Sequence, residues 1–248
     1  MPDDAPLPED LGAFDGLSHT PLGRLMAELP TRWFRASLEG AAHLPAGGAL
    51  LVGNHAMFGL DGVVLGALVV RETRRHLRFL GERNLFRFGP LARLFHAAGA
   101  VEGAPENAVA LLRRGEWVGV YPGGIDDSWK TADERYVLKW GKRSGFARVA
   151  MRAGVPILPV AAHGIDEMYT VVARERWLGR AVMGSPRYDL PLVFGAYGTL
   201  VPRRVPQRYV IGAPIDTAGD VDRPEDVERV RAATFDALDG MLRALRPA

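Results

Sequence analysis

Cysteine is absent from this sequence of 248 residues. Disulfide bonds, catalysis by a thiolate and metal sites with cysteine ligands are therefore excluded, and the composition is compatible with a reducing compartment. A G-x-S-x-G motif, which the nucleophile elbow of an ordinary lipase or esterase requires, is also absent. Four of the six histidines have no acid or second histidine at a ligand spacing, namely His19, His43, His76 and His96. We therefore expect no metal site.

Long hydrophobic runs are missing as well. The longest nearly continuous apolar run extends from Gly62 to Val70, far short of the roughly 20 residues that a membrane-spanning helix needs. Residues 1–20 contain three prolines and scattered acids, so they resemble a loose arm and not a signal peptide. We expect a cytoplasmic protein that associates with the membrane peripherally, if it handles lipid.

The charge is nearly balanced, with a formal net value of +2 at pH 7, but the basic residues are grouped. Two such groups are Arg71, Arg74, Arg75 and Arg78, and Arg203, Arg204 and Arg208. Each group can simply be a solvated face, or the two can bind anionic lipid headgroups or the phosphates of coenzyme A. No recognised nucleic-acid-binding motif accompanies them, so we do not expect nucleic acid as a partner.

Strand-like and helix-like patterns alternate along the chain. Strand patterns occur at 35–38, 49–52, 78–80, 117–121, 155–160 and 208–212, and helical spacing at 63–70, 106–114 and 143–153 and near the C-terminus. This alternation predicts one α/β domain over residues 31–248, with a mixed, largely parallel sheet flanked by helices. Two prolines within 155–160 predict that this strand lies at an edge of the sheet or is bulged.

Residues 1–30 are interpreted as an N-terminal arm with a possible interfacial helix. Apolar residues recur at helical spacing between Pro21 and Leu29, and Trp33 and Phe34 follow. The helix can pack on the domain, or it can lie in the membrane interface with Trp33 at the level of the headgroups.

A histidine and a carboxylate flank a turn after the strand at 49–52. His55 follows that strand, and Asp61 lies near the start of the next helix. If His55 is in the turn and Asp61 in the first helical turn, the carboxylate can hold one imidazole nitrogen while the other takes a proton from a hydroxyl. Alternatively, Asp61 only complements a helix N-terminus, and His55 is a turn residue satisfied by the backbone.

This segment has the form N-H-x5-D, and Tyr121-Pro122-Gly123-Gly124 follows 60 residues after Asp61. The pattern resembles the glycerolipid acyltransferase family, whose signature is N-H-x4-D followed by F-P-E-G. The extra residue before Asp61 and P-G-G in place of P-E-G resemble the branch of diacylglycerol acyltransferase and phytyl ester synthase-like proteins. Asp127, three residues after the P-G-G turn, fits the same branch, and the resemblance spans about residues 35–215.

The resemblance implies the glycerolipid-acyltransferase fold and transfer of an acyl group from acyl-CoA or acyl carrier protein to a lipid alcohol. No cofactor is implied beyond this thioester co-substrate. His55 would be the general base, and Asp61 would orient it. Substrate contacts are expected from Asn54, Tyr121, Pro122, Gly123, Gly124 and Arg148. The two glycines can expose amides to an oxyanion or a phosphate, or can form only a tight turn.

The sequence departs from the family at the acceptor site. A short strand in the family ends in G-x-x-x-x-R, whose arginine holds an acceptor phosphate, but the matching residues from Gly99 to Pro105 contain no arginine. Glu102 would repel a phosphate, and a helix from Glu106 should carry Arg113 and Arg114 away from the site. We therefore expect a neutral acceptor, such as a diacylglycerol, a monoacylglycerol or a long-chain alcohol.

Two other functions remain open. The His–Asp pair can activate water in a hydrolase, or the chain can be a non-catalytic lipid-binding protein on an acyltransferase scaffold. His163, at the end of the strand pattern at 155–160, is interpreted as structural. The apolar and aromatic residues of 165–200 can form a wall or lid of an acyl pocket, or can simply be core.

Overall fold

The structure is a computed structural model that describes residues 21–81, 99–175 and 190–246. The described strands of the main sheet lie in the order β1-β9-β6-β2-β5-β3-β4, and a separate hairpin pairs β7 with β8. Their bounds are β1 Ser37–Glu39, β2 Ala49–Gly53, β3 Leu77–Gly81, β4 Ala100–Glu102, β5 Trp117–Val120, β6 Ile157–His163, β7 Thr170–Glu175, β8 Leu190–Phe194 and β9 Arg208–Ile211. Within the described part of this sheet, β6 and β9 are antiparallel and the other neighbours are parallel. The predicted mixed, largely parallel sheet is confirmed.

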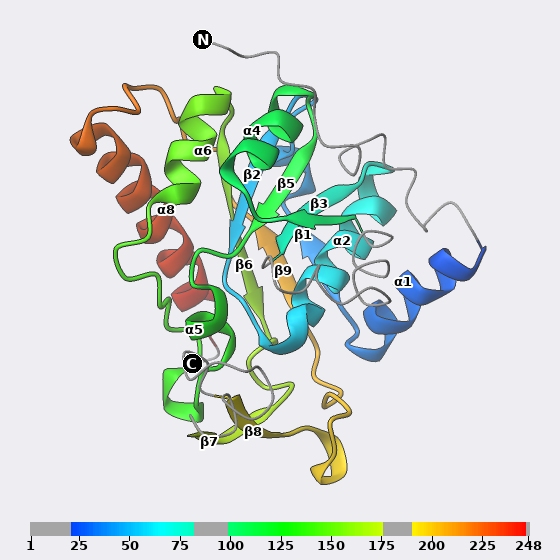
Figure 1. Cartoon of the computed structure of the whole chain (residues 1–248). Coiled ribbons are helices and arrows are strands. Elements are labelled where there is room, and N and C mark those ends of the chain that lie inside the picture. The colour runs from blue at the N-terminus through cyan, green and yellow to red at the C-terminus, as the bar shows by residue number, and fades with distance from the viewer. Residues whose placement is uncertain (1–20, 82–98, 176–189, 247–248) are drawn as a thin grey trace.

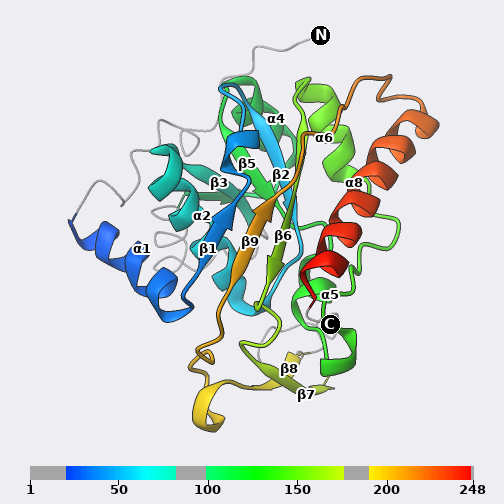
Figure 2. The same cartoon turned by 180° about the vertical axis from the view of Figure 1, so that it is seen from behind.

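Helices cover both faces of the sheet. In Figure 1, α4, α6 and α8 lie on one face, and α1 and α2 lie on the other; Figure 2 shows the same two layers from behind. The α-helices described are α1 Pro21–Trp33, α2 Leu60–Thr73, α4 Pro105–Arg113, α5 Gly124–Ser128, α6 Gly145–Ala153 and α8 Pro224–Leu245. None of the helices in these described ranges is both long enough and apolar enough to cross a bilayer.

The central strand β2 divides the core into two halves. Its five residues are all buried. Leu50 and Val52 pack with the residues of α4, α6 and α8, whereas Ala49 and Leu51 pack with those of α2. Successive side chains of a strand point to opposite faces, so β2 is held from both sides. Its carboxyl end is thereby fixed within the molecule.

The prediction that the strand at 155–160 lies at an edge of the sheet is wrong, but its pairing is irregular, as the bulge alternative implied: the register shifts by one residue between the pair Val160–Ile211 and the bridge Ile157–Ile215. Strand β6 lies inside the sheet, between β2 and β9. Pro159 is tolerated because the carbonyl oxygen of this residue accepts a hydrogen bond from the Gly212 amide, one residue beyond the end of β9. The amide that proline lacks would point to the same side, where regular pairing with β9 has ended and resumes only at the bridge between Ile157 and Ile215.

Trp140 provides a test of the core. Its side chain is fully buried and packs edge-on against Phe146 and Phe235, with ring centroids 5.2 and 5.4 Å away. We expect Trp140→Ala to lower the free energy of unfolding by about 3–5 kcal/mol. Trp140→Phe should cost less, because it keeps a ring and removes a buried Nε1 that has no hydrogen-bond partner among the described residues.

Urea unfolding of the two variants measures the difference. Val137→Ala, at an exposed site, is the control and should stay within about 0.5 kcal/mol of the parent protein. Equal losses for the alanine and phenylalanine variants would contradict this account of the packing.

Candidate active site

The site is built at the carboxyl end of β2, beside α5 (Figure 1). Asn54 is the first residue after the strand and is 1% exposed. Its Nδ2 donates to the Ala162 carbonyl oxygen at 2.9 Å, and the Ala162 amide donates back to its Oδ1 at 2.9 Å. The side chain that was predicted to contact substrate therefore ties the end of β2 to β6. This clamp fixes the chain just before His55.

The structure brings His55 and Asp61 together. The imidazole Nδ1 lies 2.9 Å from Asp61 Oδ2, and Asp61 is buried in the first turn of α2. Phe58 and Gly59 both have positive φ, of 62° and 67°. These two left-handed residues reverse the chain and direct the helix start back towards His55. Because a carboxylate only accepts, Nδ1 carries the hydrogen and Nε2 is left to accept a proton.

Opposing effects set the pKa of His55. Burial lowers it, whereas the charge and hydrogen bond of Asp61 and the charge of Asp127 raise it, and Lys130 lowers it again. The net result is a pKa above the ordinary value for histidine. The imidazole is therefore a somewhat stronger base than a free histidine, which suits proton abstraction.

Tyr121 packs against the imidazole. The two rings are stacked, with centroids 4.2 Å apart and planes 12° apart. The Tyr121 hydroxyl is buried beside the Asp61 carboxylate. Burial, and then the nearby Asp61 charge, raise the pKa of Tyr121 well above its usual value, so the hydroxyl stays neutral. Tyr121 thus supports His55 from one side.

Glycines make room for this stack. A Cβ on Gly53 would lie 3.2 Å from Tyr121 Cε1, and a Cβ on Gly119 would lie 2.6 Å from the Phe79 ring. Phe79 is in turn parallel to Tyr121, at a centroid distance of 6.0 Å. The small residues on β2 and β5 therefore let the aromatic rings lie close to the sheet backbone.

The turn Pro122-Gly123-Gly124 leads into α5. The Gly124 amide donates to the Tyr121 carbonyl at 3.0 Å, and Gly124 has a positive φ of 52°. Arg143 Nη1 donates to the Gly123 carbonyl at 2.9 Å. Gly124 thus uses its amide in a tight turn, which is the alternative that the sequence left open for this residue.

Asp127, on α5, is the residue whose importance the sequence does not reveal. It is fully buried, and its Oδ2 accepts the backbone N–H of His55 at 3.1 Å. Lys130 Nζ lies 3.6 Å from Asp127 Oδ1 and 3.0 Å from Asp166 Oδ2, and these charged groups are buried as well. The spacing from the turn singles out Asp127 in the sequence, but no sequence pattern predicts that Lys130 and Asp166 lie beside it.

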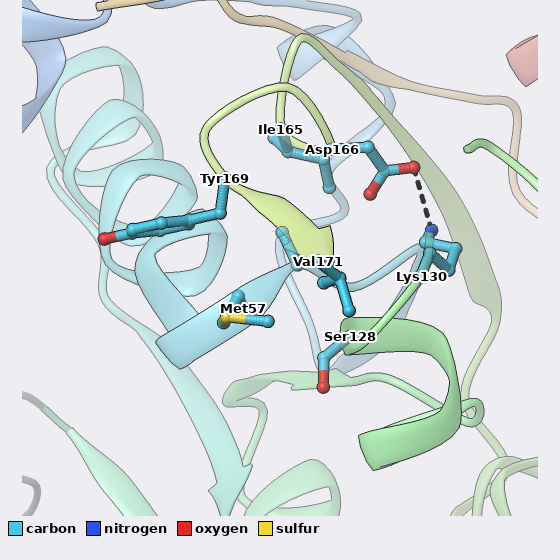
Figure 3. Close-up of a pocket in the computed structure, with 8 residues that line it drawn as sticks. Met57, Ser128, Lys130, Ile165, Asp166, Tyr169 and Val171 are labelled. Carbon is cyan, nitrogen blue, oxygen red and sulfur yellow. Dashed lines mark ion pairs between the residues drawn. The ribbon is translucent and has the colours of Figure 1, made fainter. Parts of the chain in front are cut away.

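A pocket is lined in part by Ala56 and Met57, the two residues that follow His55 in the sequence (Figure 3). It is lined by Ala56, Met57, Ser128, Lys130, Ile165, Asp166, Tyr169 and Val171. Its apolar wall comes mainly from Met57 and from residues 165–171, and the Lys130–Asp166 ion pair lies on the other side. Four residues of the stretch 165–200 therefore line this pocket, namely Ile165, Asp166, Tyr169 and Val171; residues 176–189 lie outside the described residues.

Two other candidates lie elsewhere. Arg148 is on α6, and its Nη1 donates to the Val221 carbonyl at 2.9 Å, in the loop before α8. The structure therefore gives Arg148 a structural contact and does not bring it to His55. His163 stacks on Tyr136, with centroids 5.0 Å apart. Within the described ranges, no cluster of three or more histidine, aspartate and glutamate side chains is arranged to hold a metal ion.

The first test of this geometry is a titration. We expect Asp61→Asn to lower the pKa of His55, because the variant loses the charge and the charge-assisted hydrogen bond that raise it. The histidine ring proton signals, followed by NMR against pH, measure the shift. Asp133→Asn, which changes an exposed aspartate, should leave the titration unchanged. An unaltered His55 titration in Asp61→Asn would contradict the pairing.

Known proteins show related sequences. An uncharacterized protein of Mycobacterium tuberculosis is 32% identical over 213 residues, covering 84% of this chain and 58% of the relative. A protein of Gallus gallus named DGAT1/2-independent enzyme synthesizing storage lipids is 30% identical over 206 residues, covering 81% and 58%. The human protein of the same name is 27% identical over 208 residues, covering 84% and 62%. The chain thus spans less than two thirds of the length of these relatives.

A solved structure shares the fold. The 1-acyl-sn-glycerophosphate (LPA) acyltransferase PlsC from Thermotoga maritima is 17% identical and aligns with a TM-score of 0.57, over 91% of this chain and 80% of that chain. The family model described as Acyltransferase matches residues 35–163, just over half of the chain, which include His55, Asp61 and the turn at 122–124. The resemblance to the diacylglycerol-acyltransferase-like branch of the glycerolipid acyltransferases is confirmed, and the chain belongs to the acyltransferase family.

Proposed function

We propose that this protein transfers a fatty acyl group from an acyl thioester to the hydroxyl of a neutral lipid, with His55 as the general base. The thioester is acyl-CoA or acyl carrier protein. The observation that carries the proposal is the contact of 2.9 Å between His55 Nδ1 and the buried Asp61 carboxylate. It holds the imidazole in one tautomer and leaves Nε2 to receive a proton.

The chemistry needs no covalent acyl-enzyme. His55 Nε2 takes the proton of the acceptor hydroxyl as its oxygen attacks the thioester carbonyl. The C–S bond then breaks, and the departing thiolate takes the proton from the imidazolium. Asp61 stabilises the imidazolium during this interval. The chain has no cysteine and no G-x-S-x-G motif, and Ser128, which lines the pocket, donates its hydroxyl hydrogen to the Ile125 carbonyl.

A neutral acceptor fits the charges around His55. The buried ionisable side chains described there are the carboxylates of Asp61, Asp127 and Asp166 and the ammonium of Lys130. Three carboxylates against one ammonium make an unfavourable surrounding for a phosphate.

The residues at which the sequence departs from the family support the same acceptor. Glu102 ends β4, and the residues from Gly99 to Pro105, where the family has a phosphate-binding arginine, contain none. Arg113 Nη2 donates to the Arg152 carbonyl on α6, at 3.0 Å, so the helix carries this arginine to another part of the molecule. We infer a diacylglycerol, a monoacylglycerol or a long-chain alcohol as the acceptor.

The base is tested by His55→Ala. We expect acyl transfer to fall by about 10²- to 10⁴-fold, because general-base catalysis contributes that much. The assay follows both loss of thioester and formation of acylated lipid, which separates transfer from hydrolysis. Asp61→Asn should lose less activity, in kcat more than in KM. Turnover by His55→Ala at the parent rate would refute the mechanism, and thioester loss without acylated lipid would favour a hydrolase.

The acceptor is tested by competition. Diacylglycerol and lysophosphatidic acid at equal concentrations in mixed micelles compete for one labelled acyl-CoA. We expect the neutral acceptor to be acylated preferentially, because a phosphate would lie near three carboxylates and one ammonium. A tenfold preference for the phosphate-bearing lipid, equivalent to about 1.4 kcal/mol, would overturn the neutral-acceptor proposal.

Exposed apolar side chains around the site support attachment to a lipid surface. Phe58, three residues after His55, is 59% exposed and touches the edge of Tyr169. The Tyr169 hydroxyl donates to the carbonyl of Leu200, whose side chain is 65% exposed. Trp33, at the end of α1, donates to the Pro202 carbonyl. These contacts join the end of α1, the segment at 200–202 and the turn after His55 into one apolar rim.

The two arginine groups are expected to contribute less to membrane attachment than their clustering in the sequence suggests. Arg75 donates to three backbone carbonyls and lies over the Trp117 ring. Arg78 is buried and paired with Glu116, and Arg208 is paired with Glu39. Three members of the two groups are thus engaged in internal contacts. We therefore propose that the apolar rim, and not these arginines, provides most of the attachment.

Liposome pelleting tests the apolar rim. Leu29→Glu and Leu200→Glu place a charge at exposed leucines of α1 and of the segment at 200–202. Each should lower the partition constant about tenfold or more, since burying a leucine contributes about 1.5 kcal/mol or more. Ala233→Glu, at an exposed position of α8 on the opposite face of the sheet, is the matched control. Attachment that vanishes at high salt, with the two glutamate variants unaffected, would instead assign binding to the arginines.

A further inference from the structure

Gly123 is required by its neighbour Asp127. Its φ of −68° is ordinary for any residue, so the backbone conformation does not demand glycine. A Cβ at this position, however, would lie 2.1 Å from Asp127 Cβ and 2.6 Å from its Cγ. Any larger residue at 123 would displace the Asp127 side chain. Gly123, the first glycine of the Pro-Gly-Gly turn, therefore has to be small for Asp127 to occupy its position on α5.

Asp127 uses both carboxylate oxygens on backbone amides. Its Oδ2 accepts the N–H of His55 at 3.1 Å, across 72 positions of sequence, and its Oδ1 accepts the N–H of Lys139 at 3.3 Å. The side chain is completely buried. It thus holds together the residue that carries the imidazole and the segment that follows α5. An asparagine could accept only one of these two bonds with its single carbonyl oxygen.

The buried Asp127 carboxylate has a counter-charge, the ammonium of Lys130. Lys130, one turn further along, lies between Asp127 and Asp166, at 3.6 and 3.0 Å from their oxygens. Asp166 is fixed in turn by the Tyr136 amide, which donates to its Oδ2 at 2.7 Å. Replacing a buried ion pair by apolar residues is often neutral or stabilising for the fold. A contribution to stability is therefore a weak explanation for the buried charges of Asp127, Lys130 and Asp166.

We propose that Asp127 is a positioning residue for His55: its carboxylate fixes the His55 backbone and places a negative charge near the imidazole, and Gly123 provides the space. The inference rests on the proposed function, in which His55 is the general base. Asp61 then aligns the ring through Nδ1, Tyr121 supports its face, and Asp127 anchors the peptide that carries it.

The sign of the effect on His55 follows from the groups that face it. These are Asp61 from α2, Tyr121 directly after β5, Asp127 from α5 and Lys130 two residues after α5. Tyr121 stays neutral because its pKa is raised. Asp127 raises the pKa of His55 and Lys130 lowers it. Removing the Asp127 charge should therefore lower the pKa of His55.

The test compares Asp127→Asn with Asp127→Glu and with Asp126→Asn. We expect Asp127→Asn to lower kcat by at least tenfold while KM changes less than twofold. The acidic limb of its kcat/KM profile should move to lower pH, because activity rises as the base loses its proton. Asp127→Glu keeps the charge and should hold the limb near its original position. Asp126 is an exposed neighbour on the same helix, and Asp126→Asn should behave like the parent protein.

NMR titration of His55 without substrate separates this inference from the proposed function. A lower His55 pKa in Asp127→Asn supports the positioning role, even if His55→Ala proves that the imidazole is not the base. Thermal unfolding establishes that the variants are folded at the assay temperature. An unshifted titration and an unshifted acidic limb in a folded Asp127→Asn variant would overturn the inference. So would a loss of activity that Asp127→Glu reproduces together with the same limb shift.

Discussion

The anchoring of His55 at the end of β2 is the constraint on which the rest of the site depends. Three different elements fasten this short stretch: β6 through the amide of Asn54, α2 through Asp61, and α5 through Asp127. The strand itself is buried from both faces. A general base must be held within a fraction of an ångström of its productive position. In the proposed mechanism that precision comes from the contacts that tie the loop residue His55 to β6, α2 and α5.

The sequence predicts the parts of this arrangement that are local. The apolar run of β2 and the six-residue spacing of His55 and Asp61 indicate a strand, a turn and a helix start, and the structure has all three. The clamp formed by Asn54 could not be predicted, because Ala162 offers only backbone atoms and lies 108 positions away. The role of Asp127 could not be predicted either, since it depends on an amide 72 positions away.

Interpretations that rested on residue type alone were changed by the neighbours that the fold supplies. Pro159 suggested an edge strand, but it lies where the neighbouring strand ends. The arginines at 71–78 suggested a single charged face, yet Arg75 and Arg78 hold internal carbonyls. Gly123 suggested either an amide exposed to a ligand or only a tight turn, and the space that a side chain at this position would need is taken by Asp127. For Pro159 and the arginines the deciding neighbours come from distant parts of the chain, whereas Asp127 lies only four residues after Gly123.

The Gly123–Asp127 pair also bears on how the site differs from the phosphate-handling signature that it resembles. A glutamate in P-E-G would place its Cβ where Asp127 lies, so the two arrangements exclude each other. In this chain the carboxylate comes from α5 and is directed inwards, to the backbone of His55 and to Lys130. In the proposed mechanism the acid thereby supports the base instead of facing the acceptor. A site organised in this way provides no free cationic group for a phosphate among the residues named here, which is consistent with the missing arginine after β4.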